Sequence, residues 1–335
     1  MNAMFAILGA TGAVGQEFIE ILASRGVPAD RVRLLASERS AGKRVRYGDS
    51  ELAVEAVTPE SFRGVDIGLF SAGASASREW APIAVDNGVR VVDNSSAFRM
   101  DPNVPLVVPE INPHAISNAR IIANPNCSTI IMNMAVWPLH RVNRVRRVVV
   151  STYQAVSGAG LQAMIELQEQ SRAVLDGRTP VPSVFPVQCA FNLFSHNTAI
   201  GADGYNVEET KMIQETRKIF GDPDIAITAT CIRVPVMRAH SESINLTFDK
   251  PMSVESVRQI LAAAPGVRLI DDRASNRFPM PIDASGQDDC LVGRVREDVS
   301  QPDGRGIDLF VCGDQLRKGA ALNAVQIAEL IANED

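Results

Sequence analysis

One cysteine stands in a sequence setting that suits covalent chemistry. Cys127 follows the polar turn 124–126 and precedes a long apolar stretch. Pro125 disfavours helical dihedrals in the residue before it, while Ser128 or Thr129 could cap a helix that starts at once. Cys127 would then lie at or just before a helix N-terminus, where backbone N–H groups and the helix dipole favour the thiolate. A buried structural cysteine is the alternative interpretation.

A second candidate group is His240, which lies seven residues after Arg233 in a polar segment between two predicted strands. A histidine there can act as a general acid–base group because its pKa is near neutral pH, although a structural histidine fits the pattern equally well. The other histidines have no such companions, and we assign no role to them: His114, His140 and His196.

Charged residues that could bind a polar substrate occur at two further places. Glu208 and Lys211 are three residues apart on a predicted helix and would share one face, which is also the pattern of a solvated ion pair. Arg99 ends the polar loop 94–99 and could hold an anion, or could lie as an ordinary surface charge. Taken singly, these residues do not define a reaction.

The elements that must position these groups begin with an apolar strand over 5–8, a glycine-rich turn over 9–15 and a helical pattern after it. Glycines in a strand–turn–helix unit let the backbone approach a pyrophosphate at the helix N-terminus. The spacing here is GxxGxxG and not GxGxxG, so an ordinary strand–helix turn is the alternative. We therefore predict a dinucleotide site at this turn.

The end of the second predicted strand, 32–36, indicates which dinucleotide binds. An NAD site usually offers an acid there for the ribose 2′-hydroxyl, whereas an NADP site offers hydroxyls and arginine for the 2′-phosphate. Ser37, Arg39 and Ser40 suit the phosphate, and Glu38 is the one residue that would suit NAD. The pattern predicts NADP.

Strand and helix patterns alternate through the first half of the chain, with further apolar strands over 67–70, 89–93 and 121–123. Repeated units of this kind predict a doubly wound parallel sheet of the α/β class, with ligands at the loops after its strands. The pattern changes at the β-rich run 147–160, which we take as the start of a second domain. A terminal helix is predicted over about 318–331.

Composition limits the class of protein. The chain has 335 residues, of which 46% are hydrophobic, enough for two domains, and its net charge of −6 argues against nucleic-acid binding. Its five cysteines lack the spacing of a disulfide framework or a zinc site, so we expect a reducing cytoplasm and no metal. The N-terminus lacks the features of a signal peptide, and no apolar run is long enough to predict a membrane span.

Eight segments together make the chain resemble the aspartate-β-semialdehyde dehydrogenase family over essentially its whole length. Each segment is modest alone, but their common order is specific. They are Gly9–Gly15, Ser71–Gly73, Asn94–Arg99, Asn124–Thr129, Tyr153–Gly160, Glu208–Lys211, Arg233–Val236 with His240, and Arg317–Ala321. Gln315 departs from the family's pattern, which commonly has Asn at this position.

The resemblance implies an N-terminal Rossmann-like domain that binds NADP over residues 1–127, onto which a C-terminal helix, 317–335, packs back. It also implies a catalytic and dimerisation domain of the α+β class with a mixed sheet over 128–316, in a homodimer or homotetramer. The implied reaction is the reversible, NADP-dependent conversion of L-aspartyl 4-phosphate to L-aspartate 4-semialdehyde and phosphate, on the route to lysine, methionine and threonine. It would proceed through a cysteine thioester, because a thioester accepts hydride where a carboxylate would not.

The resemblance also assigns roles to individual residues. Cys127 would be the nucleophile, His240 the acid–base group and Gln154 the residue that orients the intermediate. The implied substrate contacts are Arg233 to the α-carboxylate, Glu208 to the α-ammonium group, Arg99 and Lys211 to phosphate, and also Asn126 and Ser157. The implied cofactor contacts are Gly9, Thr11, Gly12, Ala13, Val14, Gly15, Ser37, Arg39, Ser40, Ser71, Gly73, Ser157, Gly158 and Gln315.

Three other assignments stay open. N-acetyl-γ-glutamyl-phosphate reductase shares the fold and the thioester chemistry, and a comparison of the two acyl-phosphate substrates would distinguish it. A dinucleotide-binding sensor without activity would have no need of Cys127 or His240, and both are present. A cysteine hydrolase would have no need of a nicotinamide site.

Overall fold

The computed structural model describes residues 2–301 and 303–333, which form two compact units. The first unit contains the chain up to Asn126 together with the segment from Ala320 onward, and the second unit contains Cys127–Gly319. The chain therefore leaves the first unit just before Cys127 and returns to it just after Gly319. Each unit is built on a seven-stranded sheet.

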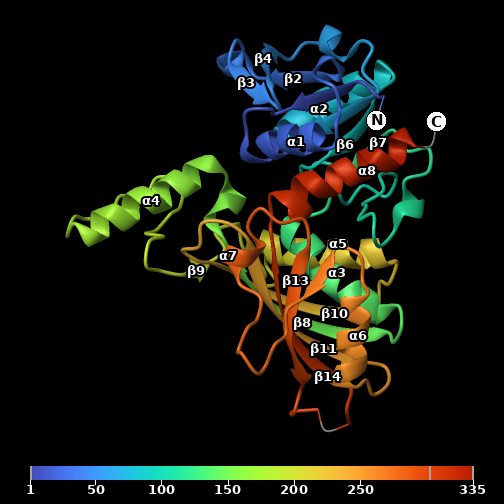
Figure 1. Cartoon of the computed structure of the whole chain (residues 1–335), viewed down its shortest axis with the longest axis vertical. Helices are drawn as coiled ribbons and strands as arrows, with labels where there is room; N and C mark the ends of the chain where they lie inside the picture. Colours follow the sequence, from blue (N-terminus) through green and yellow to red (C-terminus); the bar gives the residue numbers. More distant parts are fainter. Residues whose placement is uncertain (1, 302, 334–335) are drawn as a thin grey trace. The chain divides into compact units, whose positions relative to one another are not determined.

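The sheet of the first unit is parallel except at one edge (Figure 1). Its strand order is β3-β4-β2-β1-β5-β6-β7. The strands are β1 (Phe5–Leu8), β2 (Val32–Ala36), β3 (Arg44–Tyr47), β4 (Ser50–Ala56), β5 (Ile67–Phe70), β6 (Arg90–Asp93) and β7 (Ile121–Ala123). The predicted parallel sheet is confirmed, and an unpredicted antiparallel hairpin of β3 and β4 extends it.

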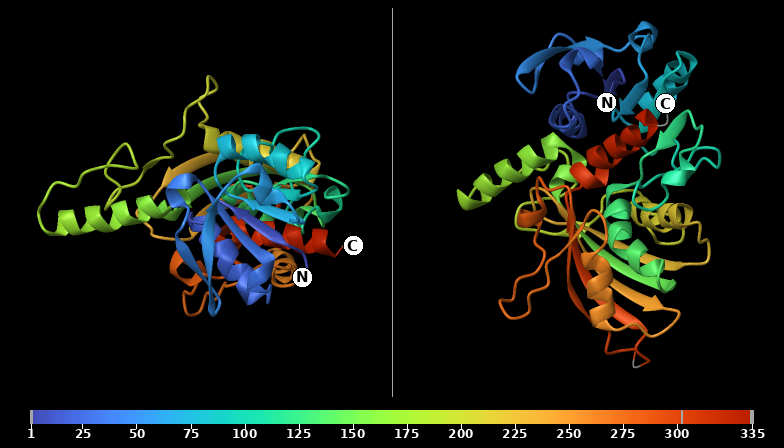
Figure 2. Two further views of the ribbon diagram at one scale, coloured as in Figure 1. Left: turned by 90° about the horizontal axis from the view of Figure 1, so that it is seen from above. Right: turned by 45° about the vertical axis from the view of Figure 1, so that its right-hand side comes forward.

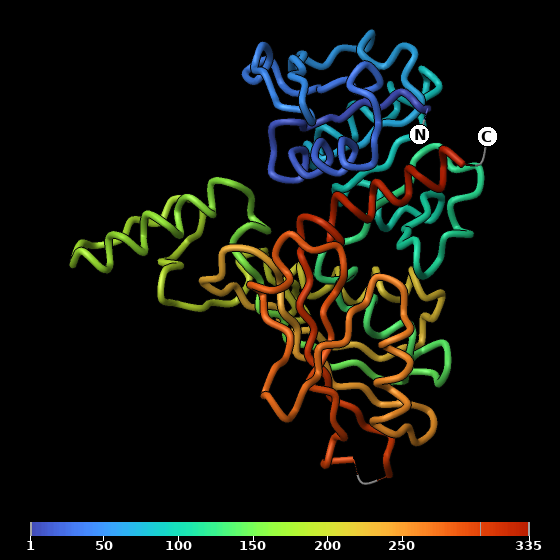
Figure 3. The backbone as a smooth tube through the Cα atoms, in the orientation of Figure 1, coloured from blue at the N-terminus to red at the C-terminus, as the bar shows by residue number. Residues whose placement is uncertain are grey.

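Helices cover both faces of this sheet, so β1 and β5 are buried along their whole length. The helices are α1 (Ala13–Ser24), α2 (Ala74–Asp86) and α8 (Leu322–Ala332), with the short 3-10 helices η1 (Ala29–Arg31), η2 (Glu38–Ser40), η3 (Pro59–Phe62) and η4 (Pro113–Ala115). Phe18 of α1 and Val325 of α8 belong to one hydrophobic core, and Ala81 of α2 belongs to another. The connection between β6 and β7, drawn in teal, is irregular apart from η4 (Figure 3).

The sheet of the second unit is mixed, as predicted, with the order β12-β13-β14-β11-β8-β10-β9. Its strands are β8 (Val145–Gln154), β9 (Phe194–Ser195), β10 (Ala226–Arg233), β11 (His240–Phe248), β12 (Val267–Leu269), β13 (Cys290–Glu297) and β14 (Gly306–Gly313). β8 pairs in parallel with β10 and antiparallel with β11. The carboxyl ends of β8 and β10 therefore lie beside the amino end of β11.

Three helices of the second unit, α3, α5 and α6, pack on the sheet, whereas α4 projects away from it (Figures 1 and 2). The elements are α3 (Cys127–His140), η5 (Val156–Ala159), α4 (Leu161–Leu175), α5 (Val207–Phe220), α6 (Val254–Ala262), α7 (Pro281–Ala284) and the π-helical turn Arg317–Ala321. Alternate residues of β8 are fully buried, among them Val148, Val150 and Thr152. Within residues 2–301 and 303–333, no helix is long and apolar enough to cross a membrane.

Candidate active site

Cys127 is the first residue of α3, which confirms the expected place of this cysteine at a helix N-terminus. The helix begins before Ser128 and Thr129, so the expected capping by either residue is wrong. A Cβ atom at Gly319 would lie 3.0 Å from the Cβ of Cys127, so glycine leaves room for the cysteine. Burial raises the pKa of three other cysteines and keeps their thiols protonated, which favours Cys127 as the nucleophile: Cys189, Cys231 and Cys312.

Strand pairing brings together three candidate residues that are far apart in the sequence. Gln154, the last residue of β8, lies directly opposite Arg233, the last residue of β10. His240 is the first residue of β11, beside the same end of β8. The expectation that His240 lies between strands is wrong, because β11 begins at His240 itself.

Gln154 links this edge of the sheet to two helices. Its Nε2 atom donates to the hydroxyl oxygen of Ser128 at 3.0 Å and to Oε1 of Glu208 at 3.5 Å. Ser128 follows Cys127 in the first turn of α3, and Glu208 is in the first turn of α5. Gln154 therefore connects the helix of the predicted nucleophile with the predicted ammonium ligand.

A capping box sets the start of α5 and the place of Glu208. Asn206 accepts a hydrogen bond from the Glu209 N–H at 3.0 Å, and the Glu209 carboxylate accepts one from the Asn206 N–H at 2.9 Å. Glu208 pairs with Lys211 at 3.2 Å, and their side chains are 6% and 26% exposed. Because Glu208 is buried, this is not the solvated surface pair that the spacing also allowed.

Arg233 is a buried cation that is held by two neighbours. Its Nη1 donates to the carbonyl oxygen of Ala155 at 2.6 Å, and its Nη2 lies 2.9 Å from Nε2 of His196. Burial lowers the pKa of Arg233, and the charges of Cys127 and Glu208 act in the opposite direction. Since a guanidinium stays protonated in proteins, Arg233 offers a positive charge that suits a carboxylate.

His240 is fully buried, and its Nδ1 accepts a hydrogen bond from the N–H of Ala155 at 3.1 Å. Burial lowers the pKa of His240 well below its usual value, and the charge of Arg233 lowers it further. The ring is therefore neutral and carries its proton on Nε2. Nε2 makes no hydrogen bond to any residue that the structure describes. A Cβ at Gly158 would lie 3.2 Å from Nε2, so glycine keeps the space beside this atom open.

The residue before His240 has an unusual backbone conformation. Ala239 is buried and has φ +72°, a left-handed value that costs alanine about 1 kcal/mol or more. Its N–H donates to Oε1 of Gln315 at 2.9 Å, and Nε2 of Gln315 donates to the hydroxyl oxygen of Ser157. Both polar atoms of the Gln315 side chain thus bind within the second unit, and its cofactor contact stays a prediction.

His196 lies beside Arg233, although the sequence suggested no role for it. It follows β9, the two-residue strand that pairs with the end of β10. Its Nδ1 lies 3.3 Å from the hydroxyl oxygen of Thr198, and burial lowers its pKa to about 4. A lone histidine in an irregular segment has no periodicity or spacing to identify it. Only the pairing of β9 with β10 places it beside Arg233.

In the first unit, the predicted glycine turn connects β1 to α1 through very close backbone contacts. Gly9 has φ +91°, and a Cβ there would lie 2.5 Å from the carbonyl oxygen of Ser71. A Cβ at Gly15 would lie 2.2 Å from the carbonyl oxygen of Gly9. Both positions therefore require glycine. Gly12 directly precedes α1, so the turn ends at a helix N-terminus, which suits a phosphate.

The other predicted cofactor residues of the first unit lie at the ends of neighbouring strands. The hydroxyl of Thr11 is 3.5 Å from that of Ser40, which brings the glycine turn next to η2. Ala13 and Val14 begin α1, Ser37 precedes η2, Arg39 is within η2, Ser71 follows β5 and Gly73 precedes α2. The glycine turn at the start of α1 fits the pyrophosphate of a dinucleotide, and the predicted contacts of the other residues stay predictions.

Arg99 is only 8% exposed, so it is not an ordinary surface charge. Its Nε donates to the carbonyl oxygen of Asn124 and its Nη2 to that of Asn94, both at 2.9 Å. Asn126, the last residue before Cys127, is also buried. The two backbone contacts orient the guanidinium of Arg99, and its predicted role toward phosphate stays a prediction.

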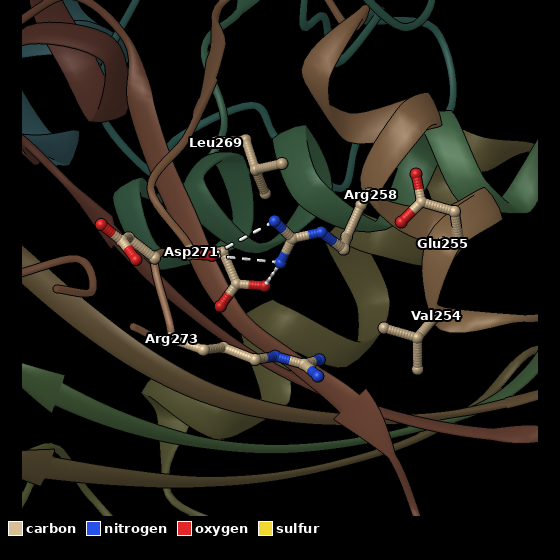
Figure 4. Close-up of a pocket in the computed structure, with 7 residues that line it drawn as sticks. Val254, Glu255, Arg258, Leu269, Asp271 and Arg273 are labelled. Carbon is tan, nitrogen blue, oxygen red and sulfur yellow. Dashed lines mark hydrogen bonds and ion pairs between the residues drawn. The ribbon is translucent and has the colours of Figure 1, made fainter. Parts of the chain in front are cut away.

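The second unit also has a pocket in which the charged side chains already bind other protein groups (Figure 4). It is lined by Val254, Glu255, Arg258, Leu269, Asp271, Asp272 and Arg273. Arg258 pairs with the carboxylate of Asp271 and donates to its carbonyl oxygen at 3.2 Å, while Arg273 donates to the carbonyl oxygen of Val295 at 2.8 Å. Both guanidinium groups are bound by protein, so we assign no ligand there. In the described parts of the chain, no group of three or more His, Cys, Asp or Glu residues could hold a metal ion.

Two family models match the chain. The semialdehyde dehydrogenase NAD binding domain matches residues 5–119, and the semialdehyde dehydrogenase dimerisation domain matches residues 136–318. The two matches together span most of the sequence.

Individual proteins are similar to the chain over nearly their whole length. Aspartate-semialdehyde dehydrogenase from Synechocystis sp. is 57% identical over 327 residues, which are 97% of this chain and 96% of the relative. The one from Aquifex aeolicus is 50% identical over 340 residues, 100% of this chain and 99% of the relative. The crystal structure of aspartate semialdehyde dehydrogenase II complexed with ASA from Vibrio cholerae has a TM-score of 0.96 at 45% identity, covering 100% of this chain and 99% of that one.

Proposed function

The chain belongs to the aspartate-semialdehyde dehydrogenase family, and from this premise we propose how its residues act. The reaction is the reversible conversion of L-aspartyl 4-phosphate to L-aspartate 4-semialdehyde and phosphate with a nicotinamide cofactor. It is a step in the biosynthesis of lysine, methionine and threonine. The observation that carries the proposed roles is the meeting of Gln154, Arg233 and His240 at the ends of three paired strands.

Cys127 is the proposed nucleophile. Its sulfur attacks the acyl carbon of aspartyl phosphate, the bond from that carbon to the phosphate oxygen breaks, and phosphate leaves with the electron pair. The acyl group is then held as a thioester at the positive end of α3. Bound NADPH supplies the hydride that reduces this thioester. The carbon–sulfur bond then breaks, Cys127 leaves as thiolate, and the aldehyde is released.

His240 is the residue predicted as the acid–base group, and we propose that its neutral tautomer acts in the reduction step as a hydrogen-bond donor. Its Nε2–H can donate to the thioester oxygen, the atom on which negative charge develops during reduction. The N–H of Ala155 occupies Nδ1 and keeps the proton on Nε2. When the carbon–sulfur bond breaks, the oxygen becomes a carbonyl again and the proton remains with the imidazole. The ring therefore returns to its neutral starting form.

The two ends of the amino acid have oppositely charged ligands. Arg233 is proposed to bind the α-carboxylate and Glu208 the α-ammonium group, and Gln154 lies within hydrogen-bond distance of Glu208. Lys211 and Arg99 are the proposed phosphate ligands. Asn126 and Ser157 complete the proposed substrate contacts. The buried ion pair of Glu208 and Lys211 fits this assignment because each partner has an opposite charge available on the substrate.

NADP is the proposed nicotinamide cofactor. Ser37, Arg39 and Ser40 lie in or before η2, and the contact between Ser40 and Thr11 brings η2 next to the glycine turn. The test is Arg39→Ala, with initial rates measured for NADP and for NAD. We expect KM for NADP to rise about 10-fold and KM for NAD to stay unchanged, because only NADP has the 2′-phosphate. Equal effects on both cofactors would contradict the proposal.

The proposed assembly is a homodimer in the cytoplasm, with a homotetramer as the larger alternative. The dimerisation-domain model spans residues 136–318, and none of the five cysteines forms a disulfide, which fits a reducing compartment. Light scattering coupled to size-exclusion chromatography would determine the mass of the assembly. A monomeric mass would contradict the proposed dimer.

Cys127→Ala tests the covalent mechanism. We expect it to abolish phosphate-dependent reduction of NADP with aspartate semialdehyde, while NADPH binding, measured by fluorescence titration, persists. Cys189→Ala is the matched control, since Cys189 is a buried thiol with a pKa raised to about 11 by burial. Substantial turnover by Cys127→Ala would contradict the thioester mechanism.

A further inference from the structure

His196 joins the two proposed ligands of the amino acid. Its Nε2 is 2.9 Å from Nη2 of Arg233, and its Nδ1 is 3.3 Å from the hydroxyl oxygen of Thr198. The same hydroxyl oxygen accepts a hydrogen bond from the backbone N–H of Glu208 at 3.3 Å. The carboxylate ligand and the ammonium ligand are thus connected through one histidine and one threonine.

The direction of these hydrogen bonds follows from the chemistry of the partners. The guanidinium of Arg233 only donates, so Nε2 of His196 must accept, and Nδ1 must carry the proton that is donated to Thr198. A neutral imidazole is required for this arrangement. Burial lowers the pKa of His196 to about 4, the charges of Arg233 and Lys211 lower it, and the charge of Glu208 acts in the opposite direction. The ring is therefore neutral at physiological pH.

Arg233 depends on this acceptor for its orientation. Its Nη1 has the carbonyl oxygen of Ala155, its Nη2 has His196, and its Nε has no hydrogen bond to any residue in the described structure. The ring of Phe185 lies 5.5 Å from the guanidinium carbon. If His196 were absent, one backbone oxygen would be the remaining hydrogen-bond partner that holds a long, flexible side chain.

We propose that His196 is a positioning residue for substrate recognition, which fixes the guanidinium of Arg233 relative to Glu208 through Thr198. Its effect is to select an aldehyde that carries both an α-carboxylate and an α-ammonium group at the separation of these two ligands. The inference rests on the proposed roles of Arg233 and Glu208. As a positioning residue, His196 acts through Arg233 and contacts neither the reacting carbon nor the cofactor.

The experiment compares His196→Ala with the conservative variant His196→Gln, whose amide oxygen can accept from Arg233. Steady-state kinetics are measured with aspartate semialdehyde, with 3-aminopropanal, which lacks the carboxylate, and with succinate semialdehyde, which lacks the ammonium group. For His196→Ala we expect KM for aspartate semialdehyde to rise about 10-fold while kcat changes less than about 2-fold. Selectivity against 3-aminopropanal should fall by about the same 10-fold.

Matched variants separate positioning from general damage. His196→Gln should restore most of the selectivity against 3-aminopropanal. Thr198→Val should lower this selectivity by only about 3-fold, because the contact between His196 and Arg233 remains. His114 is an exposed histidine in the first unit, and His114→Ala should change neither KM nor selectivity. Selectivity against succinate semialdehyde should change less than selectivity against 3-aminopropanal, since Glu208 keeps its own side-chain contacts.

Two results would overturn the inference. The first is a folded His196→Ala enzyme with unchanged KM and unchanged selectivity. The second is a loss confined to kcat, which would indicate a role at the reacting carbon. Arg233→Leu distinguishes failure of this inference from failure of the proposed function. If that variant keeps full selectivity against 3-aminopropanal, the carboxylate role of Arg233 is wrong, whatever His196 does.

Discussion

In the first unit, the predicted pyrophosphate site is a turn of seven consecutive residues, 9–15, whose tight contacts join backbone atoms. In the second unit, predicted catalytic and substrate-binding residues come from β8, α5, β10 and β11, and hydrogen bonds of their side chains connect them into a cluster: Gln154, Glu208, Arg233 and His240. This difference predicts how each site responds to substitution. An added atom should destroy the turn, whereas a neutralised side chain should weaken the cluster and leave the fold intact.

Gly15→Ala should have the largest effect, because its Cβ would lie 2.2 Å from the carbonyl oxygen of Gly9 and the backbone would have to move. We expect a loss of about 3 kcal/mol in unfolding free energy and about 100-fold weaker NADPH binding. Thermal unfolding and fluorescence titration measure the two effects. In Gly12→Ala, the matched control, the Cβ would lie 3.3 Å from the same oxygen, so less than about 1 kcal/mol should be lost. Equal losses of unfolding free energy in the two variants would contradict the role assigned to the close backbone contact at Gly15.

Glu208→Gln tests the other half of the comparison, since it neutralises a side chain without changing its size. The charge-assisted bond to the substrate ammonium group would be lost, so kcat/KM for aspartate semialdehyde should fall about 30-fold. The melting temperature should barely change, because Lys211 is partly exposed and regains water. Glu169→Gln, at an exposed position of α4, should alter neither quantity. If activity and stability fell together, the cluster would be part of the structural core.

Glu242 contrasts with the cluster, since it lies two residues after His240 on β11 and is also fully buried. Neither of its carboxylate oxygens has a hydrogen bond to a residue that the structure describes, and burial raises its pKa well above 4.5. The unfolded chain therefore loses this proton near pH 4.5, while the folded chain keeps it to higher pH. Unfolding becomes easier as pH rises through that range, by about 1.4 kcal/mol for each pH unit.

Glu242→Gln should remove this pH dependence, so its stability relative to the natural protein should increase as pH rises above 4.5. Urea unfolding at a series of pH values above 4.5 is the suitable measurement. Above about pH 7.5, His196 and His240 contribute little to the pH dependence, because their lowered pKa values keep them neutral in the folded protein and an unfolded histidine, with a pKa near 6.5, is mostly neutral as well. Glu255→Gln, at an exposed position of α6, should keep the natural protein's dependence of unfolding free energy on pH. An unchanged slope in Glu242→Gln would show that Glu242 is ionised in the folded protein.

Ala239→Gly should have the smallest effect, because one favourable term of about 1 kcal/mol is offset by two unfavourable terms of similar or smaller size. Glycine relieves the cost of φ +72°, while the buried methyl group is lost and the unfolded chain gains freedom. The net change in unfolding free energy should stay below about 1 kcal/mol in urea titrations. Ala284→Gly removes a methyl from the same core cluster without this relief and should cost more. A larger loss of unfolding free energy in Ala239→Gly than in Ala284→Gly would contradict the inferred backbone strain at Ala239.

Several apolar strands could be predicted with their observed bounds, as with β1 (Phe5–Leu8), β2 (Val32–Ala36) and β5 (Ile67–Phe70). The hairpin of β3 and β4 was missed because most of its residues are exposed and several are charged, so no buried face produces a period in the sequence. β9 has only two residues and is too short for any pattern. Of these missed strands, β3 and β9 are edge strands of their sheets, and β4 lies next to the edge.

The sequence by itself determined the features that depend on neighbouring residues. A glycine turn between a strand and a helix, and a cysteine at the start of another helix, are local because backbone dihedrals and helix ends are set within a few positions. Only the tertiary structure decided how His240 is protonated, that Glu208 is buried, and that His196 supports Arg233. Those properties depend on which strand ends lie side by side, and strand pairing joins residues whose separation along the chain carries no signal of the contact.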